Sequence, residues 1–196
     1  MSTAEVQTPP PKALPKDPYD HDWYEIVDGV RVELPPISTE STGIATILTL
    51  ALGNYGMGRN VGMPYTEMLI KLPINRDRSR KPDVIFVPFT TWARGRRLPD
   101  TAAWDIVPDL CVEVVSPTDR AGDLNNKIEE YLEAGVRQVW VVYPETAVVD
   151  VYEPSSAARR LTRADTLDGG TVLPGFTLPL AELLWDPTPA AFESDE

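Results

Sequence analysis

The chain has 196 residues, 42% of them hydrophobic, which is enough for one domain with a buried core. It contains one cysteine, Cys111, and one histidine, His21, which excludes an intramolecular disulfide framework and argues against a zinc site or a histidine-based triad. The net charge of −12 argues at first sight against a nucleic-acid partner. However, the segments 1–28 and 181–196 hold nine of the excess negative charges, whereas residues 71–97 carry eight bases and two acids.

The two ends of the chain differ in composition from its middle. Residues 1–20 contain five prolines and no apolar periodicity, which predicts a disordered leader. We expect a single folded domain over residues 21–185 and an acidic tail over residues 186–196. No signal-peptide pattern opens the chain, and its apolar runs are shorter than the ~18 to 20 residues of a membrane span, so we expect a cytoplasmic protein without a membrane partner.

A β-hairpin and a helix are expected at the start of the domain. Residues 22–34 alternate between apolar and polar side chains around Asp28-Gly29, a dipeptide typical of two-residue hairpin turns. Ser38 or Thr39 then caps a predicted helix that reaches about Tyr55. The apolar side chains of this helix follow helical spacing and are expected to form its buried face: Ile44, Ile47, Leu48, Ala51 and Leu52.

Two strands and a basic segment are predicted next. Residues 63–72 alternate weakly and fit one strand, and residues 82–87 (PDVIFV) fit a second, apolar strand. Asp83 is an anomaly there, because a mostly buried strand offers a carboxylate no water. The segment between the strands is interpreted as a loop, either with a solvated basic face or contacting nucleic-acid phosphates through Arg76, Arg78, Arg80 and Lys81. Residues 90–105 are predicted to be a charged connection with room for a helical turn.

The central unit, residues 107–145, is predicted to form a strand, a helix and a second strand. Its first strand, residues 110–115, is apolar apart from Glu113. Burying this carboxylate without a partner would cost several kcal/mol, so it must be paired, protonated or bound to a cation. The second strand, residues 136–143, is rich in β-branched and aromatic side chains, as in parallel βαβ units that are covered on both faces.

The helix between these strands, residues 123–134, carries one apolar stripe at about 3.6 residues per turn. At about 100° per residue, Lys127 lies beside that stripe and next to Tyr131, so its ammonium can reach back to the sheet. A modest surface pair of Lys127 with Asp123 is the simpler alternative. Tyr131 and Trp140 are expected to be core aromatics rather than platforms for base stacking.

The C-terminal part is expected to complete the sheet. Residues 147–152 fit a strand that pairs with the preceding strand through a turn at residues 144–146. Residues 155–172 fit one or two short edge strands with a turn at Asp168-Gly169-Gly170, and residues 178–185 fit a closing helical turn. Together the elements predict an α/β or α+β fold with a mixed central sheet flanked by helices.

Two acids and a lysine in this arrangement indicate metal-dependent phosphate chemistry. Carboxylates on neighbouring strands, here Asp83 and Glu113, can bind Mg²⁺ or Mn²⁺, which prefer oxygen ligands. Lys127 can orient or deprotonate a water and stabilise charge on a phosphate, so the set suits hydrolysis of a phosphodiester. The chain has no P-loop, no Gly-x-Gly-x-x-Gly motif and no nucleophile-elbow serine.

Four segments together resemble the bacterial Uma2 family, whose members have a restriction-endonuclease-like core. They are EIVDGVRVE (25–33), KPDVIFV (81–87), PDLCVEVVSPTDR (108–120) and KIEEYLEAGVRQVWVVY (127–143), and the resemblance runs from about residue 24 to residue 185. It implies an αβββαβ core and a PD-(D/E)XK nuclease site with Asp83 as the first acid and Glu113 as the second. It also implies Mg²⁺ or Mn²⁺ as cofactor, with the backbone carbonyl of Val114 as a third ligand, DNA as substrate and a homodimer.

Two positions depart from the expected pattern. The pattern places a lysine two residues after the second acid, where this chain has Val115, and the family resemblance moves that lysine onto the following helix, at Lys127. Many relatives carry a histidine near the start of the first helix, where this chain has Ser41-Thr42. Three residues are candidates for supporting roles, the two glutamates being more simply solvated acids: Glu33, Glu40 and Tyr131.

The sequence leaves three functions open. The first is a Mg²⁺-dependent DNA endonuclease in which Asp83 and Glu113 hold the metal and Lys127 positions the attacking water. The second is a catalytically silent nuclease fold that binds nucleic acid or a partner protein. The third is a hydrolase of small phosphoesters or nucleotides, which would be favoured if the basic segment faced away from Asp83. Divalent-metal binding through the two acids separates the first function from the second.

Overall fold

The computed structural model describes residues 23–185. The predicted leader (1–20), His21 and the acidic tail (186–196) lie outside the described residues, so the expectations for them stay predictions. The assignment of residues 21–185 to one domain likewise stays a prediction. Among the described helices, none combines the length and the apolar character that crossing a membrane requires.

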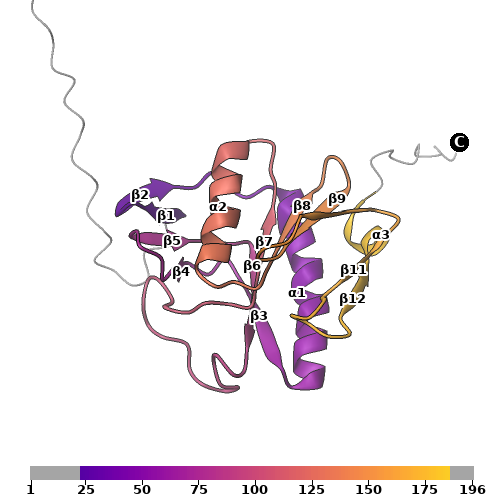
Figure 1. The fold of residues 1–196 in the computed structure, drawn as a ribbon, viewed down its shortest axis with the longest axis horizontal. Helices are drawn as coiled ribbons and strands as arrows, with labels where there is room; N and C mark the ends of the chain where they lie inside the picture. Colours follow the sequence, from indigo (N-terminus) through magenta and orange to yellow (C-terminus); the bar gives the residue numbers. More distant parts are fainter. Residues whose placement is uncertain (1–22, 186–196) are drawn as a thin grey trace, which may run out of the picture.

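A mixed six-stranded sheet forms the centre of the structure and lies between two helices (Figure 1). The helices are α1 (Thr39–Arg59) and α2 (Ala121–Glu133). The strands, in their spatial order β10-β9-β8-β7-β6-β3, are Arg159–Thr162, Val148–Tyr152, Gln138–Tyr143, Leu110–Val114, Val84–Pro88 and Gly62–Thr66. Along the chain the order is α1, β3, β6, β7, α2 and β8, with two short strands of a second sheet, Ile70–Lys71 and Arg78–Arg80, between β3 and β6. The predicted αβββαβ core is confirmed.

Only the β7–β8 pair is parallel, and α2 is the crossover between these two strands. The pairs β3–β6, β6–β7, β8–β9 and β9–β10 are antiparallel. Because both faces of β7 and β8 are covered by helices, these strands are apolar along nearly their whole length. The strand–helix–strand prediction and the antiparallel return of β9 are therefore confirmed.

Alternation along the strands sends side chains to two separate cores. Leu110 and Val112 pack with the helix α1, whereas Cys111 packs with Ile128 and Tyr131 of α2 on the other face. Glu113 has the same parity as Cys111, so its carboxylate also points to the α2 face. This alternation positions the acids described below.

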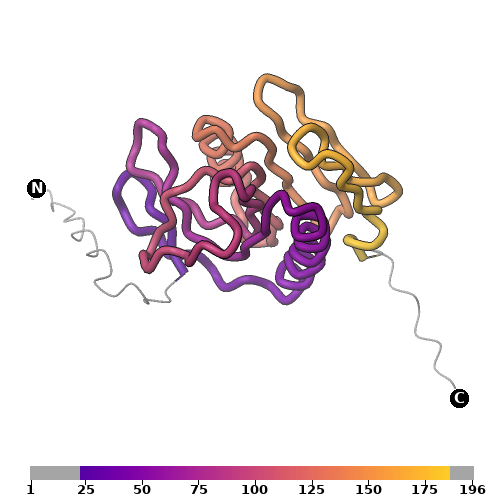
Figure 2. The backbone as a smooth tube through the Cα atoms, turned by 90° about the horizontal axis from the view of Figure 1, so that it is seen from below, coloured from indigo at the N-terminus to yellow at the C-terminus, as the bar shows by residue number. Residues whose placement is uncertain are grey.

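A second sheet contains the N-terminal hairpin, in the order β2-β1-β5-β4. Its strands are Val30–Glu33, Tyr24–Val27, Arg78–Arg80 and Ile70–Lys71. Asp28 and Gly29 both have positive φ, at 51° and 74°, as a type I′ hairpin turn requires, so the predicted hairpin is confirmed. Figure 2 shows this hairpin and the C-terminal segment at opposite ends of the structure.

Three element predictions need correction. The single strand expected at residues 63–72 is two strands in different sheets, because the backbone turns at Glu67, whose φ is 55°. The basic segment expected to be a loop contains strand β5, which pairs with both β1 and β4. The first helix continues four residues beyond Tyr55, since its end is set by Asn60 in the left-handed conformation.

The remaining segments are the connection between β6 and β7 and the C-terminal segment. Residues 90–105 form turns and a single bridge between Ile70 and Trp104, without a helix among them. The C-terminal segment adds a two-stranded sheet of β11 (Thr166–Asp168) and β12 (Thr177–Pro179), followed by α3 (Leu180–Leu183). These elements pack on the α1 face of the central sheet.

Candidate functional site

The two predicted acids lie together at one end of strands β6 and β7. Asp83 immediately precedes β6, and its Oδ2 accepts a 2.6 Å hydrogen bond from the backbone N–H of Val114 at the end of β7. The β6–β7 register pairs Ile85 with Cys111, so Asp83 and Glu113 share the α2 face of the sheet. The sheet therefore brings together two carboxylates that are 30 residues apart in the chain.

Glu113 is buried and held from α2 by two side chains. Tyr131 Oη donates a 2.6 Å hydrogen bond to Glu113 Oε1, and Lys127 Nζ lies 3.1 Å from Glu113 Oε2. The expectation that the Lys127 ammonium reaches the sheet is confirmed. Tyr131 is fully buried in the core as expected, and it also fixes the orientation of one acid.

Lys127 forms a second ion pair, with Glu25 Oε1 of strand β1 at 3.2 Å. Burial acts to lower the pKa of Lys127, but the charges of Glu113 and Glu25 outweigh it and raise the pKa above its usual value. The raised pKa favours the charged ammonium at neutral pH. An ammonium has three N–H donors, and two point to carboxylates, so one is left for a water or a phosphate oxygen.

Glu67 is a third acid at this position, and reasoning from the sequence missed it. It follows β3, and its backbone N–H donates to the Asp83 carbonyl at 3.2 Å. Its backbone carbonyl accepts a 2.5 Å hydrogen bond from Lys81 Nζ. The only signal for Glu67 is the β3–β6 register, which pairs Thr66 with Val84 and so brings the following glutamate opposite Asp83. That register cannot be read from local sequence.

We call Glu67, Asp83 and Glu113 the acid cluster. Burial, followed by the charge of Glu113, raises the pKa of Asp83 to about 8, although the Val114 N–H opposes this rise. Burial also raises the pKa of Glu67 to about 7, with Lys81 opposing and Glu113 adding to the rise. The pKa of Glu113 is raised for the same reason, burial. At neutral pH the raised pKa therefore favours a proton on Asp83, and ionising all three acids would place more negative charge here than the two lysines balance.

A small cavity of about 70 Å³ opens beside the acid cluster. Its wall includes all three acids, Val114, both lysines, and Ser38 and Ser41 from the start of α1. The donor set fits a hard divalent cation, since carboxylate and carbonyl oxygens are its preferred ligands and three carboxyl groups lie beside two lysines. No group of three or more His, Cys, Asp or Glu residues within 23–185 has the arrangement of a metal site, so the fit depends on Asp83, Glu113 and backbone oxygen.

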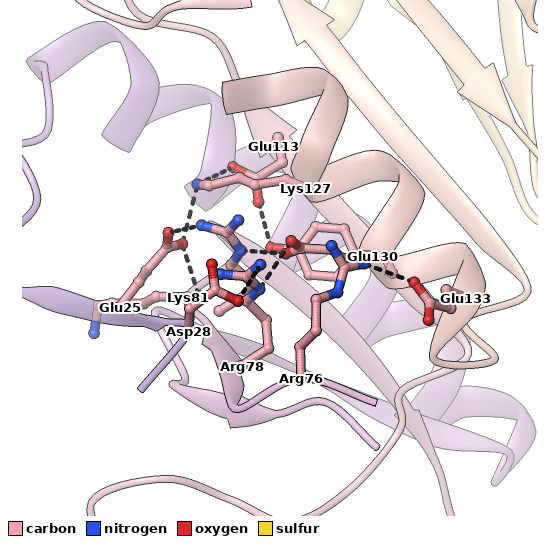
Figure 3. Close-up of polar contacts among 11 residues, drawn as sticks. Glu25, Asp28, Arg76, Arg78, Lys81, Glu113, Lys127, Glu130 and Glu133 are labelled. Carbon is pink, nitrogen blue, oxygen red and sulfur yellow. Dashed lines mark hydrogen bonds and ion pairs between the residues drawn. The ribbon is translucent and has the colours of Figure 1, made fainter. Parts of the chain in front are cut away.

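A second group of buried charges, the paired cluster, lies next to Lys127 (Figure 3). It consists of Glu25, Arg78, Arg80 and Glu130. Arg80 bonds Glu25 at 2.6 Å and Glu130 at 2.7 Å, and Arg78 Nε lies 2.9 Å from Glu130 Oε1. Unlike the acid cluster, this group balances two carboxylates with two guanidinium groups.

The paired cluster corrects part of the prediction for the basic segment. Arg78 and Arg80 are two residues apart in β5, so both point to the same face, where α2 provides Glu130. They are buried in a strand and bonded to carboxylates, so the expectation that they lie on a loop is wrong, while their contact with phosphate stays a prediction. Arg76 is exposed and pairs with Glu133 at 2.8 Å, and Lys81 lines the cavity, so both remain candidates.

The other predicted supporting residues lie apart from the acid cluster. Glu33 is exposed and accepts a hydrogen bond from Arg31, and Glu40 is exposed in the first turn of α1. Both placements fit the simpler expectation of solvated acids. Cys111 and Trp140 are fully buried, as expected of core residues.

Comparisons with known proteins agree with this architecture. The profile of the Uma2 family, described as "Putative restriction endonuclease", matches residues 13–181. No curated protein matches the chain. The fold is similar to the crystal structure of "a putative nuclease belonging to DUF820" from Anabaena variabilis ATCC 29413, with a TM-score of 0.70 and 18% sequence identity over 82% of this chain and 88% of that one. At this identity, the likeness shows a shared fold.

Proposed function

Because this chain belongs to the Uma2 family, described as "Putative restriction endonuclease", we propose that it is a metal-dependent nuclease that hydrolyses phosphodiester bonds of DNA. The observation that carries the proposal is the acid cluster, in which Asp83 and Glu113 are buried with raised pKa values and without enough cations around them. Buried unbalanced carboxylates are unfavourable unless a function requires them.

In this proposal Asp83, Glu113 and the backbone carbonyl of Val114 would hold Mg²⁺ or Mn²⁺. Such a cation, when bound, neutralises the acids and stabilises the negative charge that develops on a phosphate during hydrolysis. Tyr131 keeps Glu113 in one orientation through its 2.6 Å hydrogen bond. Metal sites depend on surrounding residues that orient the ligands in this way.

Lys127 would orient the attacking water or stabilise a phosphate oxygen through its remaining N–H. Its raised pKa keeps it charged, which suits electrostatic stabilisation rather than proton abstraction. Lys81 would add positive charge at the cavity wall. The nuclease fold further suggests a homodimer, which sedimentation of the purified chain tests, and the expected cytoplasmic location stays a proposal.

Calorimetric titration with Mn²⁺ tests the metal site directly. We expect wild-type protein to bind Mn²⁺ and the Asp83→Asn variant, which keeps the size of the side chain, to lose that binding. Glu129→Gln removes an exposed acid of α2 and is the matched control, with unchanged binding expected. Equal binding by wild-type and Asp83→Asn protein would remove Asp83 from the site.

Nicking of supercoiled plasmid with Mn²⁺ or Mg²⁺ tests the reaction. We expect Asp83→Asn to abolish nicking, and Lys127→Gln to reduce it by about 10²- to 10³-fold, as removal of one charge-stabilising donor does in other enzymes. Metal binding without nicking would favour a small phosphoester as substrate. The absence of both would leave a nuclease fold that binds its partners without catalysis.

A further inference from the structure

An apolar pocket of about 480 Å³ adjoins the acid cluster. It lies between the segment that leaves the hairpin and the first turns of α1, and Trp23, Leu34, Pro36, Ile37 and Glu67 line both this pocket and the small cavity. The two spaces are therefore neighbours that share one wall. One ligand would therefore place an apolar group in this pocket and a neighbouring group beside the acids.

Trp23 gives this pocket an aromatic wall on a backbone held by the hairpin. Its backbone carbonyl accepts a 2.8 Å hydrogen bond from Leu34 N–H, which extends the hairpin ladder by one step. The indole is 39% exposed, although it is a large apolar side chain. Lys81 Nζ lies 4.5 Å from the centre of the ring, so positive charge sits where the aromatic wall meets the acid cluster.

Polar groups face the pocket from the helix side. Thr42 and Thr46 are exposed on successive turns of α1, and their hydroxyls donate to the carbonyls of Ser38 and Thr42 at 2.9 and 2.8 Å. Their oxygens are thereby free to accept hydrogen bonds from a ligand. An aromatic wall, a few acceptors and adjacent cations are the features by which proteins bind a nucleobase attached to a phosphate.

We propose that this pocket binds a nucleobase of single-stranded nucleic acid, next to the phosphate at the acid cluster. This proposal rests on the proposed nuclease function for the identity of the adjacent phosphate. A base that is paired and stacked in a duplex cannot enter a pocket, so the base must be unpaired or extruded. The pocket therefore selects single strands over intact duplex.

Binding is measured with the Asp83→Asn variant, so that cleavage does not interfere. The probes are a fluorescein-labelled single-stranded DNA 12-mer, its duplex, and an abasic strand of the same length, all at one salt concentration because phosphate contacts depend on salt. We expect the single strand to bind more tightly than the duplex and the abasic strand. Equal binding of the abasic strand would overturn the proposal, since it carries the same phosphates without bases.

Two further substitutions in the Asp83→Asn background test the pocket from opposite walls. Trp23→Ala is expected to weaken single-strand binding by about 5- to 150-fold, whereas Trp23→Phe keeps most of it. Thr46→Tyr fills the pocket from an exposed helix position and is expected to weaken binding similarly. Met57→Ala, an exposed apolar residue at the far end of α1, is the control and should leave binding unchanged. Unchanged binding in both pocket variants would overturn the proposal.

Cleavage separates this proposal from the nuclease function. Single-strand binding that depends on Trp23, in a protein that cleaves nothing with Mn²⁺, would leave the pocket assignment standing and overturn the nuclease. Cleavage of plasmid at the wild-type rate by Trp23→Ala protein, together with its unchanged single-strand binding, would leave the nuclease standing and overturn the pocket assignment.

Discussion

The paired cluster and the acid cluster both bury charge, and they meet at Lys127, but they are balanced differently. In the paired cluster each carboxylate has a guanidinium partner at 2.6 to 2.9 Å. In the acid cluster the pKa of Asp83 rises to about 8 because its charge is buried near other acids. Burial of charge alone therefore does not identify a functional site. A buried group of charges that lacks enough opposite charges does indicate a functional site, because such a group does not stabilise the fold.

The largest expected effect comes from unbalancing the paired cluster. Glu130→Gln leaves two buried guanidinium groups short of negative charge, and we expect the free energy of unfolding to fall by about 3 kcal/mol. Urea denaturation at pH 7 measures the change. Glu129→Gln, on the exposed side of the same helix, should change the free energy by less than about 0.5 kcal/mol. Similar losses in both variants would show that the pairing contributes little.

The next effect comes from balancing the acid cluster. At a Mn²⁺ concentration of about 100 times its dissociation constant, we expect the free energy of unfolding to rise by about 2.7 kcal/mol, because the cation binds the folded chain alone. For a domain of this size, that rise corresponds to a melting temperature higher by roughly 5 to 10 °C. Asp83→Asn should remove the rise. A rise that persists in the variant would place the cation elsewhere.

A smaller effect, of opposite sign to that of Glu130→Gln, is expected from Asp83→Asn without metal. The raised pKa of Asp83 means that the folded chain binds more protons than the unfolded chain between about pH 4 and pH 8. Wild-type stability should therefore fall as pH rises through this window, by at most about 1.4 kcal/mol per pH unit for this group. Asp83→Asn should flatten the fall and be more stable than wild type at pH 8. Thermal melts from pH 5 to pH 9 measure both curves, and parallel curves would contradict the imbalance.

The smallest effect is expected at the surface. Arg76 and Glu133 form an ion pair at 2.8 Å, and both side chains are nearly half exposed. Arg76→Ala should lower the free energy of unfolding by less than about 1 kcal/mol, since water and salt screen such pairs. Urea denaturation checks this value. A loss as large as that of Glu130→Gln would mean that exposure does not distinguish the two pairs.

The sequence was sufficient for the residues whose placement follows from local periodicity. Alternation puts Glu113 on the same face as Cys111, and helical spacing puts Lys127 on the face of α2 that contacts the sheet. The resemblance of four motifs implied the αβββαβ order and identified the family.

The sequence was insufficient where a position depends on which strands pair. Glu67 lies next to Asp83 only because of the β3–β6 register. The turn at Glu67 has a positive φ, and a sequence signal for such a turn would be a glycine, which is not present at this position. Arg78 and Arg80 resemble solvated basic residues until β5 pairs with β1 and faces α2. A run of basic residues in the sequence does not show which acids they pair with, because those acids belong to elements some 50 residues away.

The small sheet of β2, β1, β5 and β4 is joined to the rest of the protein by the paired cluster and by Ile70 of β4, which packs in the core on the α2 face. Around its hairpin, the apolar cluster of the described residues has three buried members, Tyr24, Ile26 and Leu69. We therefore expect native-state hydrogen exchange to detect opening of this sheet before opening of β7 and β8, at a lower free energy than global unfolding. Each opening would withdraw Glu25 from Lys127, so the lysine would lose one of its two carboxylate partners whenever the N-terminal sheet detaches.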